Sequence, residues 1–326
     1  MPATTPTEQS EPTGPQAVEE PVARRDWTAD VALVLVAVMW GVNIPVMKHG
    51  VELIDKLAFN SIRLTFSAIV LGVLTLIERK PSKPDAQWVR IIGVVFVSGF
   101  IYQLCFVLGV GETRAGNTAL ILSTTPMWTA LLAWLAGLER LPAVAWAGLV
   151  VTFVGTLLVA VDPTQLDFGS RYFAGNMTIL LASFLWALGA VLSKPLLEQI
   201  SPTHMAFLAA TITLPFHYLI AGSKTLDGFR IMSGDLTALV CVAYSGLFST
   251  GLAYAFWNYG VRKVGPSQAS IYQNLVPMIA LTAGWFVLGE SITLIQIPGG
   301  ILILGGLLIM RRGRANRPSV KWGAKQ

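Results

Sequence analysis

The sequence predicts an all-α integral membrane protein with ten transmembrane helices, arranged as two inverted five-helix repeats. Three observations predict this fold class. Apolar runs of about 17 to 24 residues follow one another through most of the chain. Lysine and arginine are concentrated in alternate connecting segments. Residues of the first part of the chain recur in the second part at a nearly constant spacing.

The apolar runs are the strongest of these observations. Hydrophobic residues make up 54% of the chain and charged residues only 13%, against about 25% charged residues in an average soluble domain. Such runs require a bilayer as their solvent. Breaks at charges, Gly and Pro place the expected spans near 31 to 47, 59 to 77, 90 to 110, 116 to 137 and 143 to 161, then near 174 to 192, 204 to 221, 236 to 257, 268 to 288 and 293 to 310.

The distribution of Lys and Arg predicts the orientation. Cytoplasmic loops keep an excess of these residues. With ten spans and the N-terminus inside, 16 Lys and Arg residues fall on the cytoplasmic side and 6 on the other side. We therefore expect a multi-pass protein of the cell (inner) membrane with both termini in the cytoplasm. Arg63 is the one Lys or Arg inside an expected span.

An internal duplication predicts the two halves. A shift of 146 residues aligns Trp40 with Trp186 and Lys48 with Lys194. Such matches in register indicate a repeat, and because five spans are an odd number, the two halves must insert with opposite topology. A shift of 151 residues, without a gap, aligns Gly109 with Gly260, Pro126 with Pro277, Glu139 with Glu290, Gly148 with Gly299 and Gly155 with Gly306.

The chain is expected to divide into four parts. Residues 1–29 are rich in Pro, Thr, Glu and Gln and lack an apolar run, which predicts a disordered cytoplasmic arm and no cleavable signal. Residues 30–162 and 173–311 form the first and second repeats. Residues 312–326 form a basic cytoplasmic tail.

Inverted repeats are typical of secondary transporters, because two near-equivalent halves can expose one central site to either side in turn. An integral membrane enzyme and a non-transporting scaffold remain as alternatives. No metal-binding or nucleotide-binding motif favours an enzyme with a cofactor, and Cys105 and Cys241 lie within apolar runs. The expected partners are a small-molecule solute and membrane lipid, and a homodimer is possible. The basic residues are scattered and form no clustered face, which argues against binding of nucleic acid.

Several motifs resemble a known family. The run W-G-V-N-I-P-V-M-K from Trp40 to Lys48 resembles the opening motif of the EamA family in the drug/metabolite transporter superfamily. The segments G-V-G-E-T-R-A-G-N-T-A-L-I-L-S-T-T-P-M, ending at Met127, and G-P-S-Q-A-S-I-Y-Q-N-L-V-P-M, ending at Met278, resemble its repeat signature. Arg63 falls where the family often has an Arg in the second helix. The resemblance covers roughly residues 31 to 310, and it implies ten helices, a central cavity between the halves, and export of metabolites such as amino acids.

Polar residues within spans are the first candidates for a solute site, because they cost free energy unless they face protein or a water-filled path. In the ninth span, we expect Gln268, Tyr272, Gln273 and Asn274 to form a polar stripe that lines the pathway or holds helices together. Ser123, Thr124 and Thr125 are the counterpart in the fourth span, although such hydroxyls also bond carbonyls of their own helix. Pro126 and Pro277 are expected to bend these spans, as hinges or as structural kinks.

Further candidates come from the other spans. The amide of Asn43 offers donors and an acceptor to a solute. The matched Trp40 and Trp186 are candidates for stacking on a solute, with packing as the alternative. Tyrosine hydroxyls and one more amide would add polar groups to an apolar cavity: Tyr102, Gln103, Tyr244 and Tyr254.

We expect the charged residues to be mainly structural or gating groups. Arg63 is expected to reach outward or to pair with Glu52 or Asp55. Lys48 and Lys194 are expected to bond carbonyls at helix ends, and Glu139 and Glu290 to bond neighbouring backbone amides. Four-helix relatives of the family that export cationic drugs are known for a glutamate in the first helix, and the corresponding region here holds Trp40, Gly41 and Asn43. The resemblance therefore implies no fixed preference for cations. A neutral or zwitterionic solute fits better.

Overall fold

The computed structural model describes residues 27–78, 88–137, 141–161, 170–193, 196, 199–264 and 272–315, which form helices and short connections without a strand. Most of the expected arm and tail lies outside these residues. Their inner borders need correction, however: α1 already begins at Trp27, and α15 continues to Ala315. At both borders the helix continues past the apolar run into polar residues.

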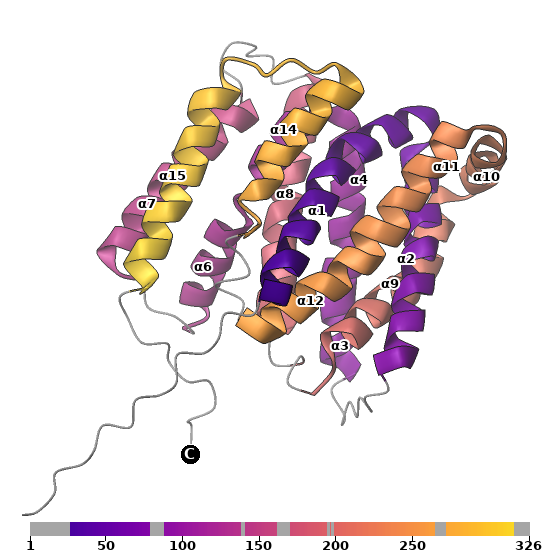
Figure 1. Ribbon diagram of the computed structural model, residues 1–326, viewed down its shortest axis with the longest axis horizontal. Helices are drawn as coiled ribbons and strands as arrows, with labels where there is room; N and C mark the ends of the chain where they lie inside the picture. Colours follow the sequence, from indigo (N-terminus) through magenta and orange to yellow (C-terminus); the bar gives the residue numbers. More distant parts are fainter. Residues whose placement is uncertain are drawn as a thin grey trace, which may run out of the picture.

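The helices of the first half and then of the second half follow in chain order (Figure 1). The first half contains α1 (Trp27–Leu53), α2 (Lys56–Glu78), α3 (Trp88–Val95), the π-helix η1 (Phe96–Ile101), α4 (Tyr102–Glu112), α5 (Ala115–Leu122), α6 (Thr125–Leu135) and α7 (Ala143–Val161). The second half contains α8 (Arg171–Ser193), α9 (Pro202–Ala221), α10 (Lys224–Gly234), α11 (Leu236–Ala243), the π-helix η3 (Tyr244–Leu252), α12 (Ala253–Val264), α14 (Leu275–Leu288) and α15 (Gln296–Ala315).

Seven helical stretches within the described residues are long and apolar enough to cross a membrane. Three shorter apolar helices accompany them, at Ala143–Val159, Leu275–Leu288 and Gln296–Met310. Large apolar side chains such as Leu76, Val89 and Leu219 are exposed on the outside of the bundle, as expected where lipid covers a protein. The chain is therefore a multi-pass membrane protein.

Two local features differ from the sequence prediction. The first helix runs past Lys48 to Leu53, so Lys48 lies within a helix instead of ending one. The polar segment between α9 and α11, expected to be a loop, forms α10 at the edge of the bundle (Figure 1). Its low hydropathy concealed it from a search for apolar runs.

The two halves share irregularities at matching positions. Each contains a π-helical segment between two α-helices, η1 from Phe96 and η3 from Tyr244. Each also contains a helix that begins one or two residues before the matched proline, α6 at Thr125 and α14 at Leu275. The spacings of 148 and 150 residues agree with the shifts found in the sequence. Irregular backbone at equivalent positions is what a duplicated fold produces.

Helix contacts between the halves also occur in matching pairs. A Cβ at Gly109 of α4 would lie 2.7 Å from Ile179 of α8, and one at the matched Gly260 of α12 would lie 2.5 Å from Leu33 of α1. In each half, the helix that ends the third expected span, α4 or α12, therefore packs closely on the first helix of the other half, α8 or α1. A side chain at either glycine would separate these helices.

Helices α7 and α15 pack side by side along their lengths (Figure 1). A Cβ at Gly148 would lie 2.5 Å from the Gly306 carbonyl oxygen, and one at Gly306 would lie 2.5 Å from the Thr152 nitrogen. Small residues let helix backbones approach in this way within a membrane. The glycines matched in the sequence therefore serve the same contact from both sides.

Candidate functional site

A cavity of about 120 Å³ lies where helices of both halves meet. It is large enough for several water molecules or a small organic group. Residues from α1, α2, α4, α5, α6 and α14 line it together with residues of α8, η3 and α12. The lining consists of Trp40, Asn43, Ile44, Arg63, Tyr102, Gln103, Phe106, Ala119, Leu122, Ser123, Thr125, Pro126, Trp186, Ser249, Thr250, Tyr254, Gln273, Asn274 and Val276.

Aromatic rings form one wall of the cavity. The ring centroids of Trp186 lie 4.9 Å from Tyr102 and 5.6 Å from Tyr254, and Trp40 lies 6.0 Å from Tyr254. The Trp40 indole Nε1 donates to the Ser249 carbonyl oxygen at 3.0 Å, which fixes the ring between α1 and η3. The two tryptophans matched by the repeat thus face one cavity from different halves.

Two helix breaks form another part of the wall. α5 ends at Leu122 and α6 begins at Thr125, while Gln273 and Asn274 directly precede α14. Pro126 and Pro277 lie in the first turns of α6 and α14, where a missing N–H costs nothing. The expectation that these prolines bend continuous helices therefore needs correction: each lies just after a break. Both breaks leave polar backbone and side chains beside the cavity.

Arg63 is almost fully buried, with 1% of its surface exposed, and it lies at the centre of a hydrogen-bond network. Its Nη2 donates to Gln103 Oε1 and to Asn60 Oδ1, both at 2.7 Å. Nε also donates to Asn60 Oδ1 at 3.1 Å, and Nη1 donates to Thr250 Oγ1 at 3.1 Å. The guanidinium thus connects α2 with α4 and η3.

The prediction that Arg63 reaches outward or pairs with Glu52 or Asp55 is therefore wrong. Arg63 lies two turns inside α2, too deep to reach the end of the helix. Asp55 pairs with Lys224 at 2.9 Å instead. Glu52 lies 3.9 Å from His49.

Asn43 is buried, with 4% of its surface exposed, and it lines the cavity. Its Oδ1 has no hydrogen-bond partner among the described residues. An unsatisfied buried acceptor costs about 1–3 kcal/mol. A donor from a bound solute or water would remove that cost.

The structure brings together most of the residues proposed from the sequence. Ten of the candidates for solute binding line the cavity: Trp40, Asn43, Tyr102, Gln103, Ser123, Thr125, Trp186, Tyr254, Gln273 and Asn274. Thr124 lies behind the wall, where its Oγ1 donates to the Ile121 carbonyl oxygen. Ser123 and Thr125 make similar bonds to Leu120 and Leu122, as sequence reasoning had anticipated for hydroxyls of this segment.

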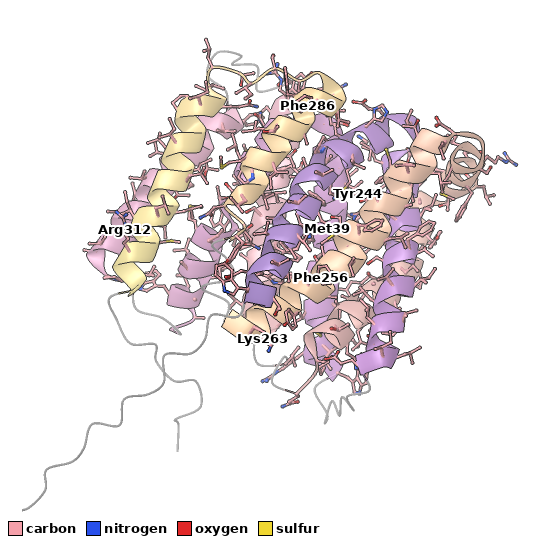
Figure 2. All side chains as sticks on the ribbon, in the orientation of Figure 1. Met39, Tyr244, Phe256, Lys263, Phe286 and Arg312 are labelled. Atoms are coloured by element: carbon pink, nitrogen blue, oxygen red, sulfur yellow. The ribbon has the colours of Figure 1, made fainter. Side chains whose placement is uncertain are left out.

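Other candidates lie away from the cavity or outside the described residues. The Tyr244 hydroxyl donates to the Met39 carbonyl oxygen at 3.2 Å, on the neighbouring α1 (Figure 2). The Tyr272 hydroxyl donates to Asp30 near the start of α1. Neither tyrosine lines the cavity. Gln268, Glu139 and Lys194 lie outside the described residues.

The two remaining charged candidates bond backbone at helix ends. Lys48 Nζ lies 3.4 Å from the Gly111 carbonyl oxygen, in the last turn of α4. Glu290 Oε2 accepts from the Ala115 N–H at 3.0 Å, where α5 begins. The amide bonded by Glu290 belongs to the other half of the chain, and not to the neighbouring backbone that the sequence suggested.

Sequence reasoning missed Ser249 and Thr250 of η3. Both are small hydroxyl residues in an apolar run, where they resemble ordinary packing residues. The one available signal was their spacing from Tyr244 and Ser245, four to six residues earlier, which places several polar groups on neighbouring turns. That signal does not reveal that Thr250 bonds Arg63.

Comparisons with known proteins agree with this architecture. A probable amino-acid metabolite efflux pump of Escherichia coli is 25% identical, over 90% of this chain and 98% of that protein. A probable terminal-alkyne amino-acid exporter of Streptantibioticus cattleyicolor is 26% identical over 88% and 94%. An uncharacterized transporter of Archaeoglobus fulgidus is 25% identical over 87% and 99%.

One solved crystal structure superposes with a TM-score of 0.59 and covers 90% of this chain and 100% of that chain. At 16% sequence identity, this likeness concerns the fold alone. The model of the EamA-like transporter family matches the chain twice, at residues 27–161 and 173–312. Two matches in one chain agree with the duplication read from the glycine, proline and glutamate spacings. The chain belongs to the EamA-like transporter family.

Proposed function

We propose that this protein is a secondary transporter that exports an amino acid or a similar neutral or zwitterionic solute across the cell (inner) membrane by alternating access. Ten transmembrane helices form two inverted halves, and the short helices α7, α14 and α15 count among them. Both termini lie in the cytoplasm, as the excess of Lys and Arg on that side indicates.

The observation that carries the proposal is the shared cavity. Its lining contains Trp40 and Asn43 of the first half and Trp186 and Asn274 of the second half. A site formed by both halves changes its exposure when the halves exchange conformations, which is what alternating access requires. Two relatives named as amino-acid exporters or efflux pumps support a solute of this class and its outward direction.

An enzyme remains the weaker candidate. The transporter names of the relatives point to a non-enzymatic function. Among the described residues, no group of three His, Cys, Asp or Glu side chains could hold a metal ion. The polar groups at the cavity are mostly amides and hydroxyls, which suit binding better than proton transfer at neutral pH.

The experiment is flux of a panel of radiolabelled amino acids and related metabolites into proteoliposomes. We expect a few solutes to exchange faster than in protein-free liposomes. Trp40→Ala and Trp186→Ala should each weaken the apparent affinity about 2- to 10-fold, because an aromatic contact contributes about 0.5–1.5 kcal/mol. Trp285→Ala is the matched control, since Trp285 is exposed away from the cavity.

A wild-type protein that moves none of these solutes would contradict the proposed class of solute. Unaltered affinity in both cavity variants, together with normal flux, would place the solute elsewhere.

A further inference from the structure

We propose that the cavity contains a carboxylate-binding subsite with Arg63 as its cation, so that a transported solute must carry a carboxylate group. This inference rests on the proposed function and deepens it. It assigns the contact that selects the solute, and it adds a requirement that a merely neutral solute would not meet.

Arg63 is a buried cation. Its four hydrogen bonds within the described residues go to neutral side chains, those of Asn60, Gln103 and Thr250. Among the ion pairs within the described residues, none includes Arg63. A buried cation without a counter-charge is costly. An anionic group in the adjoining cavity would supply that counter-charge.

One N–H donor of Arg63 is unused within the described residues. A guanidinium has five N–H donors, and the bonds to Asn60, Gln103 and Thr250 use four of them. The fifth, on Nη1, has no partner among the residues that the structure describes. Arg63 lines the cavity, and the three neutral partners hold the guanidinium in place. Charge-assisted bonds from such a fixed group to a carboxylate are short and strong.

The two helix breaks place helix N-termini at the cavity. Thr125 and Pro126 in the first turn of α6 line the cavity, as do Asn274 and Val276 at the start of α14. The N-terminus of a helix carries a partial positive charge and favours anions. One such terminus comes from each half. The start of α14 therefore adds to the positive potential of Arg63, whereas at the start of α6 the C-terminal end of α5 at Leu122, which also lines the cavity, offsets it.

Asn43 offers a contact for the other end of the solute. The unsatisfied Oδ1 of Asn43 lines the same cavity and accepts hydrogen bonds. An ammonium or amide N–H of the solute is a suitable donor for it. A positive region together with a free acceptor, beside aromatic rings, matches a solute with a carboxylate and an N–H group on an apolar frame.

The experiment compares solutes that differ in one group. Proteoliposomes with wild-type protein would be supplied with L-leucine, L-phenylalanine, the amide of each, and the amine that each gives on loss of its carboxylate. We expect the acids to move and the amides and amines to move at least about 10-fold more slowly, since a lost charged hydrogen bond leaves its partner unpaired.

Three variants test Arg63 itself. Arg63→Gln should reduce flux of the acids about 10- to 100-fold, and Arg63→Lys should restore part of it. Gln103→Glu provides an independent test, because it puts a carboxylate within bonding distance of Nη2. That internal counter-ion should compete with the solute and weaken its apparent affinity about 10-fold or more. Arg230→Gln, on the exposed face of α10, is the matched control.

The outcomes separate this inference from the proposed function. If acids and their amides move at equal rates, the protein transports but the carboxylate subsite is wrong. Unchanged affinity for the acids in a folded Gln103→Glu variant would overturn it as well. If the wild type moves no member of the series, the proposed function fails and the inference fails with it.

Discussion

Glu290 connects the two halves through one carboxylate. It lies just after α14 and accepts the N–H of Ala115, the first residue of α5. A carboxylate at this position satisfies a free backbone donor and stabilises the positive end of the helix dipole. The repeat had identified the residue, but the partner lies 175 residues away, so no local pattern could indicate it.

We predict that Glu290→Gln lowers the free energy of unfolding by about 0.3–1 kcal/mol, because the amide keeps the hydrogen-bond acceptor but loses the negative charge at the helix N-terminus. The thermal unfolding midpoint of the purified protein in detergent would measure the loss. Glu52→Gln is the control, because the Glu52 side chain is 57% exposed near the end of α1. Equal midpoints for Glu290→Gln and Glu52→Gln would show that the charge of Glu290 contributes no stability.

Arg63 marks the limit of sequence reasoning at the residue scale. Its position in an apolar run predicted a costly polar group, and it is one. Its partners Asn60, Gln103 and Thr250 come from three separate helical segments. Which of them would converge depends on tertiary packing, and the sequence therefore suggested the nearer acids of the helix end instead.

At the scale of elements, the contact between α7 and α15 explains why the repeat retains glycine. Gly306 faces α7, whereas its neighbour Gly305 would meet no atom within 4 Å of an added Cβ. Adjacent residues on one helix thus differ sharply in the space around them. The sequence showed which glycines match but not which surface each one faces.

This difference gives a matched pair of substitutions. Gly306→Ala should destabilise the protein by about 1–3 kcal/mol, because the added methyl group forces two backbones apart. Gly305→Ala should be neutral or slightly stabilising, since alanine favours a helix by about 1 kcal/mol over glycine. Thermal unfolding in detergent measures both, and destabilisation by Gly305→Ala equal to that by Gly306→Ala would refute the close contact.

The helix breaks at the cavity show what a proline does and does not reveal. Pro126 and Pro277 were expected to bend continuous helices, and the structure has a helix beginning at each of them instead. Both outcomes follow from the missing N–H. Whether the helix bends or breaks depends on how well packing supports the turn before the proline. The sequence of one chain does not indicate that.

At the scale of the whole molecule, one group of polar contacts lies where α4 ends and α5 begins. Glu112 at the end of α4 pairs with Lys56, which begins α2, and approaches Arg171 of α8 at 3.9 Å. Gln296 of α15 donates to Asn117 of α5 at 2.7 Å. The contacts of Glu112 with Arg171 and of Gln296 with Asn117 join the halves outside the cavity.

The general architecture was accessible from the sequence because it rests on long-range regularities. Apolar length indicated the membrane, and the spacing of Gly148, Gly155, Gly299 and Gly306 indicated the duplication that the family match supports. The residues of the cavity were less accessible. Thr250 bonds Arg63 from within the π-helical segment η3, which the sequence did not predict.

The central claim is that a solute crosses through the cavity between the halves, and blocking that cavity tests it most directly. In a background with Cys105→Ser and Cys241→Ser, Ser123→Cys places one thiol in the cavity wall. Flux of a transported amino acid into proteoliposomes would be measured before and after labelling with a bulky thiol reagent. We predict that complete labelling abolishes flux and that the solute slows the labelling. Full flux after complete labelling would contradict the account.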